Sequence, residues 1–319
     1  MATFKQLLNA SLKSEDTEEW LDVHFNRPIG LLFALLWDKL GVHPNVITIL
    51  SCFLGAAAGV MFYFTDLTHN LLGMLFLVLA DLCDSTDGQM ARLTGKKTLL
   101  GRILDGASGD VWFFFIYLFL CLRLTPENIP GTTIHWGIWI WLLAFAAGIL
   151  CHTPQSSLSD YYRQIHLFFL KGKDGSELDN SEKQTKEYHN TPKNHYLARL
   201  FFSQYARYCK SQEKRTPKFQ KFFAWWKVFA ATHTKEECED VRQKFLQGSR
   251  PLMKFTNILT FNTRAIVIYI TCILGSKTGD AIGPWIYFVF EITVMNILYA
   301  YMWHKHEDLC SKMTSDFSK

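Results

Sequence analysis

The sequence predicts an all-α, polytopic membrane protein with six transmembrane helices, an N-terminal interfacial helix and a helical cytoplasmic insertion. Hydrophobic residues make up 49% of the chain and charged residues only 19%, whereas a soluble domain usually carries roughly 25% charged residues. The hydrophobic residues gather in six runs, and the charge gathers elsewhere. Residues 171–254 hold 18 Lys and Arg against 10 Asp and Glu, a net charge of +8, while the whole chain is +4. Disordered, collagen-like and disulfide-scaffold classes are excluded.

The eight cysteines are spread along the chain without a CxxC pair. Several lie in apolar runs, where a thiol behaves as a small hydrophobic group. We therefore expect neither a disulfide framework nor a zinc site. The first 29 residues lack the basic start, apolar core and small-residue cleavage site of a signal peptide, so none is expected.

The first predicted element is an amphipathic helix over Trp20–Leu40. Phe33, Leu36 and Trp37 would form its apolar face. Charged residues interrupt the segment, so we expect it to lie along the membrane interface rather than across the bilayer.

Six segments have the length and apolarity to cross a bilayer core of ~30 Å as helices. Tryptophans near several of the predicted ends fit an aromatic belt. The six predicted spans are Asn45–Thr65, Leu71–Ala91, Thr98–Arg123, Ile134–His152, Phe255–Leu274 and Ile282–Trp303.

Basic residues in the loops predict the orientation of the spans. The connections near 66–70, 124–133 and 276–281 hold one basic residue, Lys277. The connection after the second span has Lys96 and Lys97, flanked by Arg92 and Arg102, and the connection after the fourth span is the +8 segment. Because cytoplasmic loops carry the excess of Lys and Arg, we expect both termini and the active site on the cytoplasmic side.

The basic insertion predicts a division of the chain into 1–170, 171–254 and 255–319. Within it, Lys171–Asn194 reads as a mobile loop, and helices are expected over Tyr196–Ser211, Pro217–Thr232 and Lys235–Gln247. The middle helix places aromatic residues largely on one side, bordered by lysines. That pattern suits anionic lipid headgroups and equally suits packing on the protein's own cytoplasmic face.

Charged residues inside the second and third spans are the strongest functional signal. Each would cost ~2.5–3.5 kcal/mol at the centre of a membrane helix, so they require neutralisation by protons or cations and a water-filled cavity. These residues are Asp81, Asp84, Asp87, Arg92, Arg102, Asp105 and Asp110.

The spacing of the acids suggests a metal site. Asp84 and Asp87 are three residues apart and share a helix face, and Asp105 on the next, antiparallel span can face them. Carboxylates converging from two helices suit hard divalent cations, and two such ions can clamp a displacement at phosphorus. Gly88 and Gly101 leave room for a ligand at the backbone, and Arg92 could pair with a phosphate. Intramembrane acids also occur in ion-coupled transporters.

The pattern Asp84-x2-Asp87-Gly88-x2-Ala91-Arg92-x8-Gly101-x3-Asp105 resembles the signature of the CDP-alcohol phosphatidyltransferases, integral membrane enzymes of phospholipid synthesis. His43-Pro44-Asn45-Val46-Ile47-Thr48 also looks like that family's first transmembrane helix. The resemblance covers roughly residues 25–170 and 255–303, so the insertion lies outside it.

The resemblance implies a transferase that needs two Mg²⁺ or Mn²⁺ ions and a CDP-linked donor, whose phosphorus is attacked by an acceptor hydroxyl with release of CMP. It also implies site residues. Asp84, Asp87, Asp105 and Asp110 would ligate the metals, with Asp105 and Asp110 catalytic. Gly88, Ala91, Arg92 and Gly101 would line the nucleotide site.

One position departs from the family pattern. The family's last acid follows Asp105 at x3, where this chain has Gly109, and the nearest acid is Asp110. A π-bulge in the third span would realign Asp110 with Asp105, which is our first expectation for the general base. Asp81 or a water molecule is the second, and a degenerate, inactive homologue is the third.

The donor is expected to be CDP-diacylglycerol, with a polar alcohol or an alcohol phosphate of the inositol phosphate or glycerol phosphate type as acceptor. Arg163 and Arg264 are candidates for holding an acceptor phosphate, or they are interfacial anchors. The alternatives are a lipid acceptor that attacks CDP-choline or CDP-ethanolamine, and a cation-coupled transporter. Expected partners are the bilayer and phospholipid substrates, with no nucleic acid; a homodimer is also considered.

Overall fold

The computed structural model describes residues 3–11, 14, 16–96 and 98–317, and this part of the chain contains helices and no strand. Lys97, used above for orientation, lies outside it. Six helices of the described chain are long and apolar enough to cross a bilayer, which confirms the predicted class of integral membrane protein. These helices are Pro44–Phe62, Leu67–Thr94, Leu99–Leu124, Ile138–Lys171, Lys235–Thr278 and Trp285–Phe317.

Four of the six helices run beyond the predicted spans, because polar sequence continues the helix after the apolar run ends. The second span is α4, Leu67–Thr94, which ends at Gly95 in a left-handed conformation (φ 71°). Gly95 stops the helix because the left-handed region is open to glycine without strain.

The contacts divide the chain into two compact units, residues 1–152 with 261–294 and residues 153–260 with 295–319. The predicted segments 1–170, 171–254 and 255–319 are consecutive along the chain, whereas each spatial unit combines parts of more than one of these segments. The first unit contains the helices α1 Phe4–Ser11, η1 Asp22–Asn26, α2 Arg27–Lys39, α3 Pro44–Phe62, α4 Leu67–Thr94, α5 Leu99–Leu124, α6 Ile138–Phe145, η2 Ala146–His152, α13 Phe261–Thr278 and α14 Trp285–Phe290, with most of η5 Glu291–Met295.

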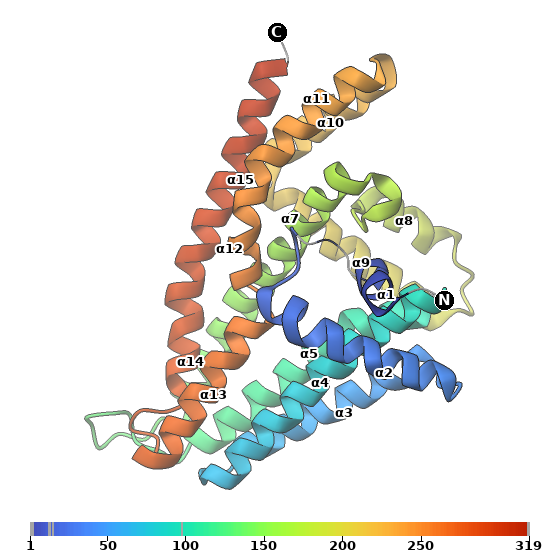
Figure 1. Cartoon of the computed structure of the whole chain (residues 1–319). Coiled ribbons are helices and arrows are strands. Elements are labelled where there is room, and N and C mark those ends of the chain that lie inside the picture. Colours follow the sequence, from blue (N-terminus) through green and yellow to red (C-terminus); the bar gives the residue numbers. More distant parts are fainter. Residues whose placement is uncertain (1–2, 12–13, 15, 97, 318–319) are drawn as a thin grey trace. The chain divides into compact units, whose positions relative to one another are not determined.

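In the first unit, α3, α4 and α5 lie side by side (Figure 1). Gly55 and Gly59 on α3 allow α5 to approach closely. A Cβ on Gly59 would lie 2.7 Å from the backbone carbonyl carbon of Phe115, and one on Gly55 would overlap the Trp112 ring. Small residues four apart are the usual means of close helix packing in membranes. This packing brings α5, which carries Asp105 and Asp110, close to α3.

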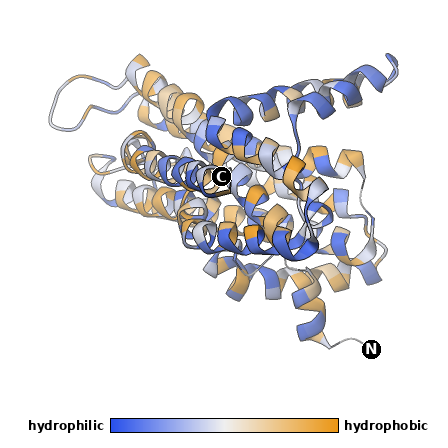
Figure 2. Ribbon diagram, turned by 90° about the horizontal axis from the view of Figure 1, so that it is seen from above, coloured by the Kyte–Doolittle hydropathy of each residue, from blue (hydrophilic) through white to orange (hydrophobic). Residues whose placement is uncertain are grey.

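Large hydrophobic side chains also remain exposed on these helices, for example Phe53 at 70% and Phe114 at 62%. In Figure 2, hydrophobic residues, in orange, recur along many of the helices. Because apolar surface turned outward is stable in lipid and costly in water, this pattern fits helices surrounded by a bilayer.

The predicted N-terminal amphipathic helix is present as the π-helix η1 followed by α2. Leu31 and Ala34 of α2 are buried, while Leu36 and Leu40 are exposed. The buried face of α2 packs against α4. An additional helix, α1, was not expected from the sequence.

The second unit contains α7 Thr153–Lys171, η3 Lys173–Gly175, α8 Ser181–Asn190, α9 Tyr196–Arg215, α10 Pro217–Thr232, α11 Lys235–Ser249, η4 Arg250–Leu252, α12 Met253–Ile258 and α15 Asn296–Phe317. The prediction of a loop over Lys171–Asn194 is wrong for Ser181–Asn190. Asn180 caps this helix by accepting from the Lys183 backbone N–H. Packing on α9 stabilises it, and neither contribution gives an apolar pattern in the sequence.

The aromatic face of α10 packs inside the second unit. Phe219 and Phe222 are fully buried and Trp226 is 7% exposed. Phe222 stacks on Phe245 of α11, with ring centroids 5.5 Å apart. The aromatic side of α10 therefore packs on other helices of the protein, rather than facing lipid headgroups.

Candidate active site

Asp87 is the most buried acid of the motif, with 3% of its surface exposed. It lies on α4, is hydrogen-bonded to Thr48 of α3, and interacts electrostatically with Asp84, Asp105 and Arg92. Its Oδ2 atom is buried and has no hydrogen-bond partner. A buried carboxylate oxygen without a partner is costly, so this atom is suited to binding a cation or a donor group.

Ser108 of α5 links the Asp84 side chain to the main chain of Asp105. The Ser108 hydroxyl donates to Asp84 Oδ1 at 2.8 Å, and its oxygen lies 2.9 Å from the Asp105 carbonyl oxygen. The structure thus brings Asp84, Asp87 and Asp105 together at the contact between α4 and α5. Neither Ser108 nor Thr48 was expected to contact the acids. Ser108 lies one helical turn after Asp105, and Thr48, the last residue of the His43–Thr48 run, lies one turn after Pro44.

The donor set fits a divalent cation in its chemistry, because hard cations such as Mg²⁺ prefer carboxylate oxygens. The oxygens do not yet converge. Within residues 3–11, 14, 16–96 and 98–317, no group of three or more His, Cys, Asp or Glu side chains is positioned to hold a metal ion.

The predicted π-bulge in the third span is wrong. Helix α5 is α-helical from Leu99 to Leu124. With about 100° per residue, Asp110 lies about 140° around the helix from Asp105, whereas Ser108 lies about 60° away in the other direction. The structure therefore does not bring Asp110 to the helix face where Ser108 contacts Asp84. A Cβ added to Gly109, about 40° from Asp105, would meet no atom within 4 Å.

Of the predicted nucleotide-site residues, Gly88, Ala91 and Arg92 lie near the end of α4, and Gly101 lies in the first turn of α5. The Arg92 guanidinium lies over Gly88, because a Cβ on Gly88 would be 3.3 Å from Arg92 Nη1. A Cβ on Gly101 would be 2.8 Å from Asn45 Oδ1, so Gly101 allows the start of α5 to approach the start of α3. Ala91 is half-buried on α4.

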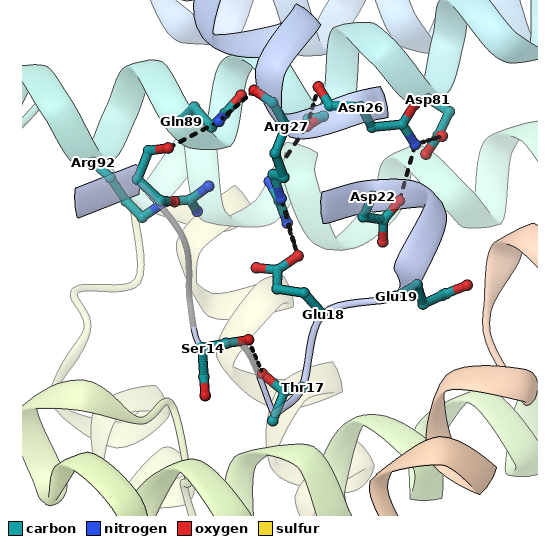
Figure 3. A network of polar contacts seen from close by, with 12 residues as sticks. Ser14, Thr17, Glu18, Glu19, Asp22, Asn26, Arg27, Asp81, Gln89 and Arg92 are labelled. Carbon is teal, nitrogen blue, oxygen red and sulfur yellow. Dashed lines mark hydrogen bonds and ion pairs between the residues drawn. The ribbon is translucent and has the colours of Figure 1, made fainter. Parts of the chain in front are cut away.

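A polar network joins the N-terminal segment to the motif helix (Figure 3). Gln89 donates to Ser11 Oγ at 2.9 Å and to the Arg27 carbonyl at 3.0 Å, and Arg92 Nε donates to the Ser11 carbonyl at 2.7 Å. Asn26 donates to Asp81 Oδ2 at 2.6 Å. From the sequence this segment was expected only to lie along the membrane interface, because long-range contacts between polar side chains leave no periodic pattern along the chain.

The two candidate acceptor arginines lie in different units. Arg264 of α13 is 1% exposed, and its Nε is 2.7 Å from Glu291 Oε1. This ion pair neutralises its charge within the first unit. Arg163 lies on α7 of the second unit and has a buried Nε without a hydrogen-bond partner.

Comparison with known proteins agrees with this geometry. Residues 41–154 match the sequence model of the CDP-alcohol phosphatidyltransferase family. An uncharacterised protein from Aquifex aeolicus (strain VF5) is 40% identical over 69 residues, which are 22% of this chain and 34% of that protein. The match thus spans about a third of the relative's length. The family consists of phosphotransferases that act on CDP-linked substrates, and its match covers all the motif acids. Residues 41–154 of this membrane protein are therefore similar to the CDP-alcohol phosphatidyltransferase family.

Proposed function

We propose that the protein transfers a substituted phosphate group from a CDP-linked donor to an acceptor hydroxyl, with release of CMP. The main observation in support is the meeting of Asp84, Asp87 and Asp105 on two membrane helices of the matched domain. A transporter would also use intramembrane acids, but the nucleotide-site residues of the motif would then have no role.

Asp84, Asp87 and Asp105 would hold Mg²⁺ or Mn²⁺, and we propose two ions, as the motif implies. A bound divalent cation would neutralise charge on the attacking and leaving oxygens. The protein's own contribution is to hold the acids on packed helices, so that little reorganisation is needed during the reaction. Arg92, with its guanidinium over Gly88, would bind a donor phosphate.

The acceptor hydroxyl must lose a proton. Asp110 was the first candidate for the base, but a regular α5 directs it away from the carboxylate face. We propose that a water molecule in the open space beside Gly109 accepts the proton and passes it to the carboxylate of Asp105. This space lies on the Asp105 side of α5 and has no atom within 4 Å of the ideal Cβ position.

For the substrates, we propose CDP-diacylglycerol as donor and a polar alcohol or alcohol phosphate as acceptor, at a site open to the cytoplasm. Arg264, in the same unit as the motif acids, is already paired with Glu291, so a phosphate of the acceptor would have to compete with that carboxylate. That pairing is also the observation that favours the second candidate, a lipid acceptor attacking CDP-ethanolamine or CDP-choline, because this reaction needs no phosphate site for the acceptor.

The experiment is CMP release by the purified full-length protein with Mg²⁺ or Mn²⁺ and either labelled CDP-diacylglycerol or labelled CDP-ethanolamine. CMP released from one donor identifies the arrangement. Asp87→Asn should abolish CMP release, because an amide replaces a carboxylate that would ligate the metal ion. Asp174→Asn, which changes an exposed acid of the second unit, is the matched control.

Wild-type rates in Asp87→Asn would contradict the proposed site. If neither donor releases CMP and the protein conducts cations in liposomes, the transporter interpretation replaces the transferase.

A further inference from the structure

Two arginines from distant parts of the sequence, one on α2 and one on the motif helix α4, lie near one another. Arg27 begins α2 and Arg92 lies in the last turn of α4, and their charges interact. Arg27 also donates through Nη1 to Ser85 Oγ at 3.4 Å, a residue between Asp84 and Asp87. Two guanidinium groups held close together repel each other unless an anion lies nearby. The arrangement therefore needs a negative group.

Glu18 supplies that negative group. Its Oε2 lies 3.0 Å from both Nε and Nη2 of Arg27, and its charge also acts on Arg92. The Glu18 side chain is only 4% exposed and that of Arg27 14% exposed. In Figure 3, the Arg92 guanidinium points toward the Arg27–Glu18 pair. A carboxylate thus occupies the position that an external anion would take beside the two arginines.

The polar atoms beside this pair are incompletely satisfied. Arg92 Nη2 and Gln89 Oε1 are both buried without a hydrogen-bond partner. Such orphaned atoms are costly in a purely structural network. A ligand with phosphate oxygens would satisfy the arginine, since guanidinium groups bind phosphate through two parallel hydrogen bonds.

We propose that Arg27 and Arg92 together form a phosphate-binding site for the CDP-linked donor, and that Glu18 occupies this site until a donor phosphate displaces it. The inference rests on the proposed transferase function and adds a donor-binding residue outside the matched domain, which begins at residue 41. The displaced carboxylate would leave the arginine pair, so donor binding would loosen the segment before α2.

The test is CDP binding by the full-length protein in lipid nanodiscs with Mg²⁺, by equilibrium dialysis with labelled nucleotide. Arg27→Gln should weaken CDP binding by about tenfold or more, because a hydrogen bond to a charged group contributes about 1.5–3 kcal/mol. Cytidine, which has no phosphate, should bind both proteins equally. Lys39→Gln removes a charge from the exposed end of the same helix and should leave CDP binding unchanged.

Glu18→Gln tests whether Glu18 competes with the donor phosphate or instead holds the two arginines in position. Without the competing charge, CDP should bind severalfold more tightly than to the wild type. If Glu18 instead holds the arginines in position, Glu18→Gln should bind CDP more weakly than the wild type, because the arginines would lose their fixed orientation. Arg27→Lys, which keeps the charge, should recover part of the affinity that Arg27→Gln loses.

The outcomes distinguish the two levels of the proposal. Wild-type CDP affinity in Arg27→Gln, or weaker binding in Glu18→Gln, would overturn the arginine site while leaving the transferase in place. A wild-type protein that binds no CDP would overturn both.

Discussion

Gly109 is the residue at which this chain departs from the motif of its domain. The family pattern places an acid there, and the chain has one at the next position, Asp110. One residue of offset changes the direction of a helical side chain by about 100°. The regular α5 therefore separates the motif position from the nearest carboxylate, and a substitution at each position can tell which one serves the reaction.

Asp110→Asn is expected to keep CMP release within about threefold of wild type, because Asp110 does not share the face of Ser108 and Asp105. Gly109→Asp should raise the rate, since its Cβ meets no atom within 4 Å and a positioned base contributes typically 10²–10⁴-fold. Rates of CMP release at saturating donor measure both effects. An inactive Asp110→Asn protein that still folds and binds CDP would instead establish Asp110 as the base.

The acids and arginines of the site also show what residue patterns can predict. Asp84, Asp87 and Asp105 were expected to meet because their spacing places them on facing helices. Thr48, Ser108, Glu18 and Arg27 were not expected at the site. Each is a polar residue of a type common on protein surfaces. Only its contacts with residues of α4 or α5 connect it to the site.

At the scale of elements, close packing of α3 on α5 holds the motif acids in place. Gly59→Ala should lower the free energy of unfolding by about 1–3 kcal/mol, because the added methyl group would meet the backbone of Phe115 and Ile116 at 2.7 and 2.9 Å. Backbone atoms cannot move aside as a flexible side chain can. Gly106→Ala in α5 is the matched control, since no atom lies within 4 Å of its Cβ position.

The control should be neutral or stabilising by about 0.5–1 kcal/mol, because alanine has the higher helix propensity. Thermal unfolding of both variants in the same detergent provides the comparison. Equal midpoints for Gly59→Ala and Gly106→Ala would show that the α3–α5 contact is looser than the structure has it.

The elements themselves were predicted with uneven success. The six apolar helices were expected because each buries its backbone hydrogen bonds within one segment, as the bilayer requires. The polar helix Ser181–Asn190 was missed because its stability comes from a cap and from α9. The π-helical turns occur at Asp22–Asn26, Ala146–His152 and Glu291–Met295, and α5, where one was expected, has none.

At the scale of the first unit, a buried ion pair stabilises the C-terminal end of α5, and the motif residues lie toward its N-terminal end. Arg123 binds both carboxylate oxygens of Asp280, at 2.8 and 2.7 Å. It also donates to the Phe62 and Phe64 carbonyls and to Asn70. One guanidinium thereby joins α3, α4, α5 and the connection between α13 and α14.

Asp280→Asn should destabilise the protein by roughly 3–5 kcal/mol, because it leaves the Arg123 charge buried without a counter-charge. Asparagine tolerates the positive φ of 60° at this position, so the effect reports the charge rather than the backbone. The thermal midpoint measures it, with Lys277→Gln at an exposed site of α13 as the control. A midpoint unchanged from wild type would mean that water reaches this ion pair.

The sequence by itself determined the membrane class, the apolar helices, the motif and the acids that meet in it, because hydrophobic length and helical spacing are local properties. The tertiary structure alone decided that α5 is regular, that the aromatic face of α10 is buried, that Arg264 is paired, and that Glu18 and Arg27 lie beside Arg92. These outcomes depend on contacts between segments far apart in the chain. Such contacts are selected by packing and charge compensation in three dimensions, and no periodicity along the sequence encodes them.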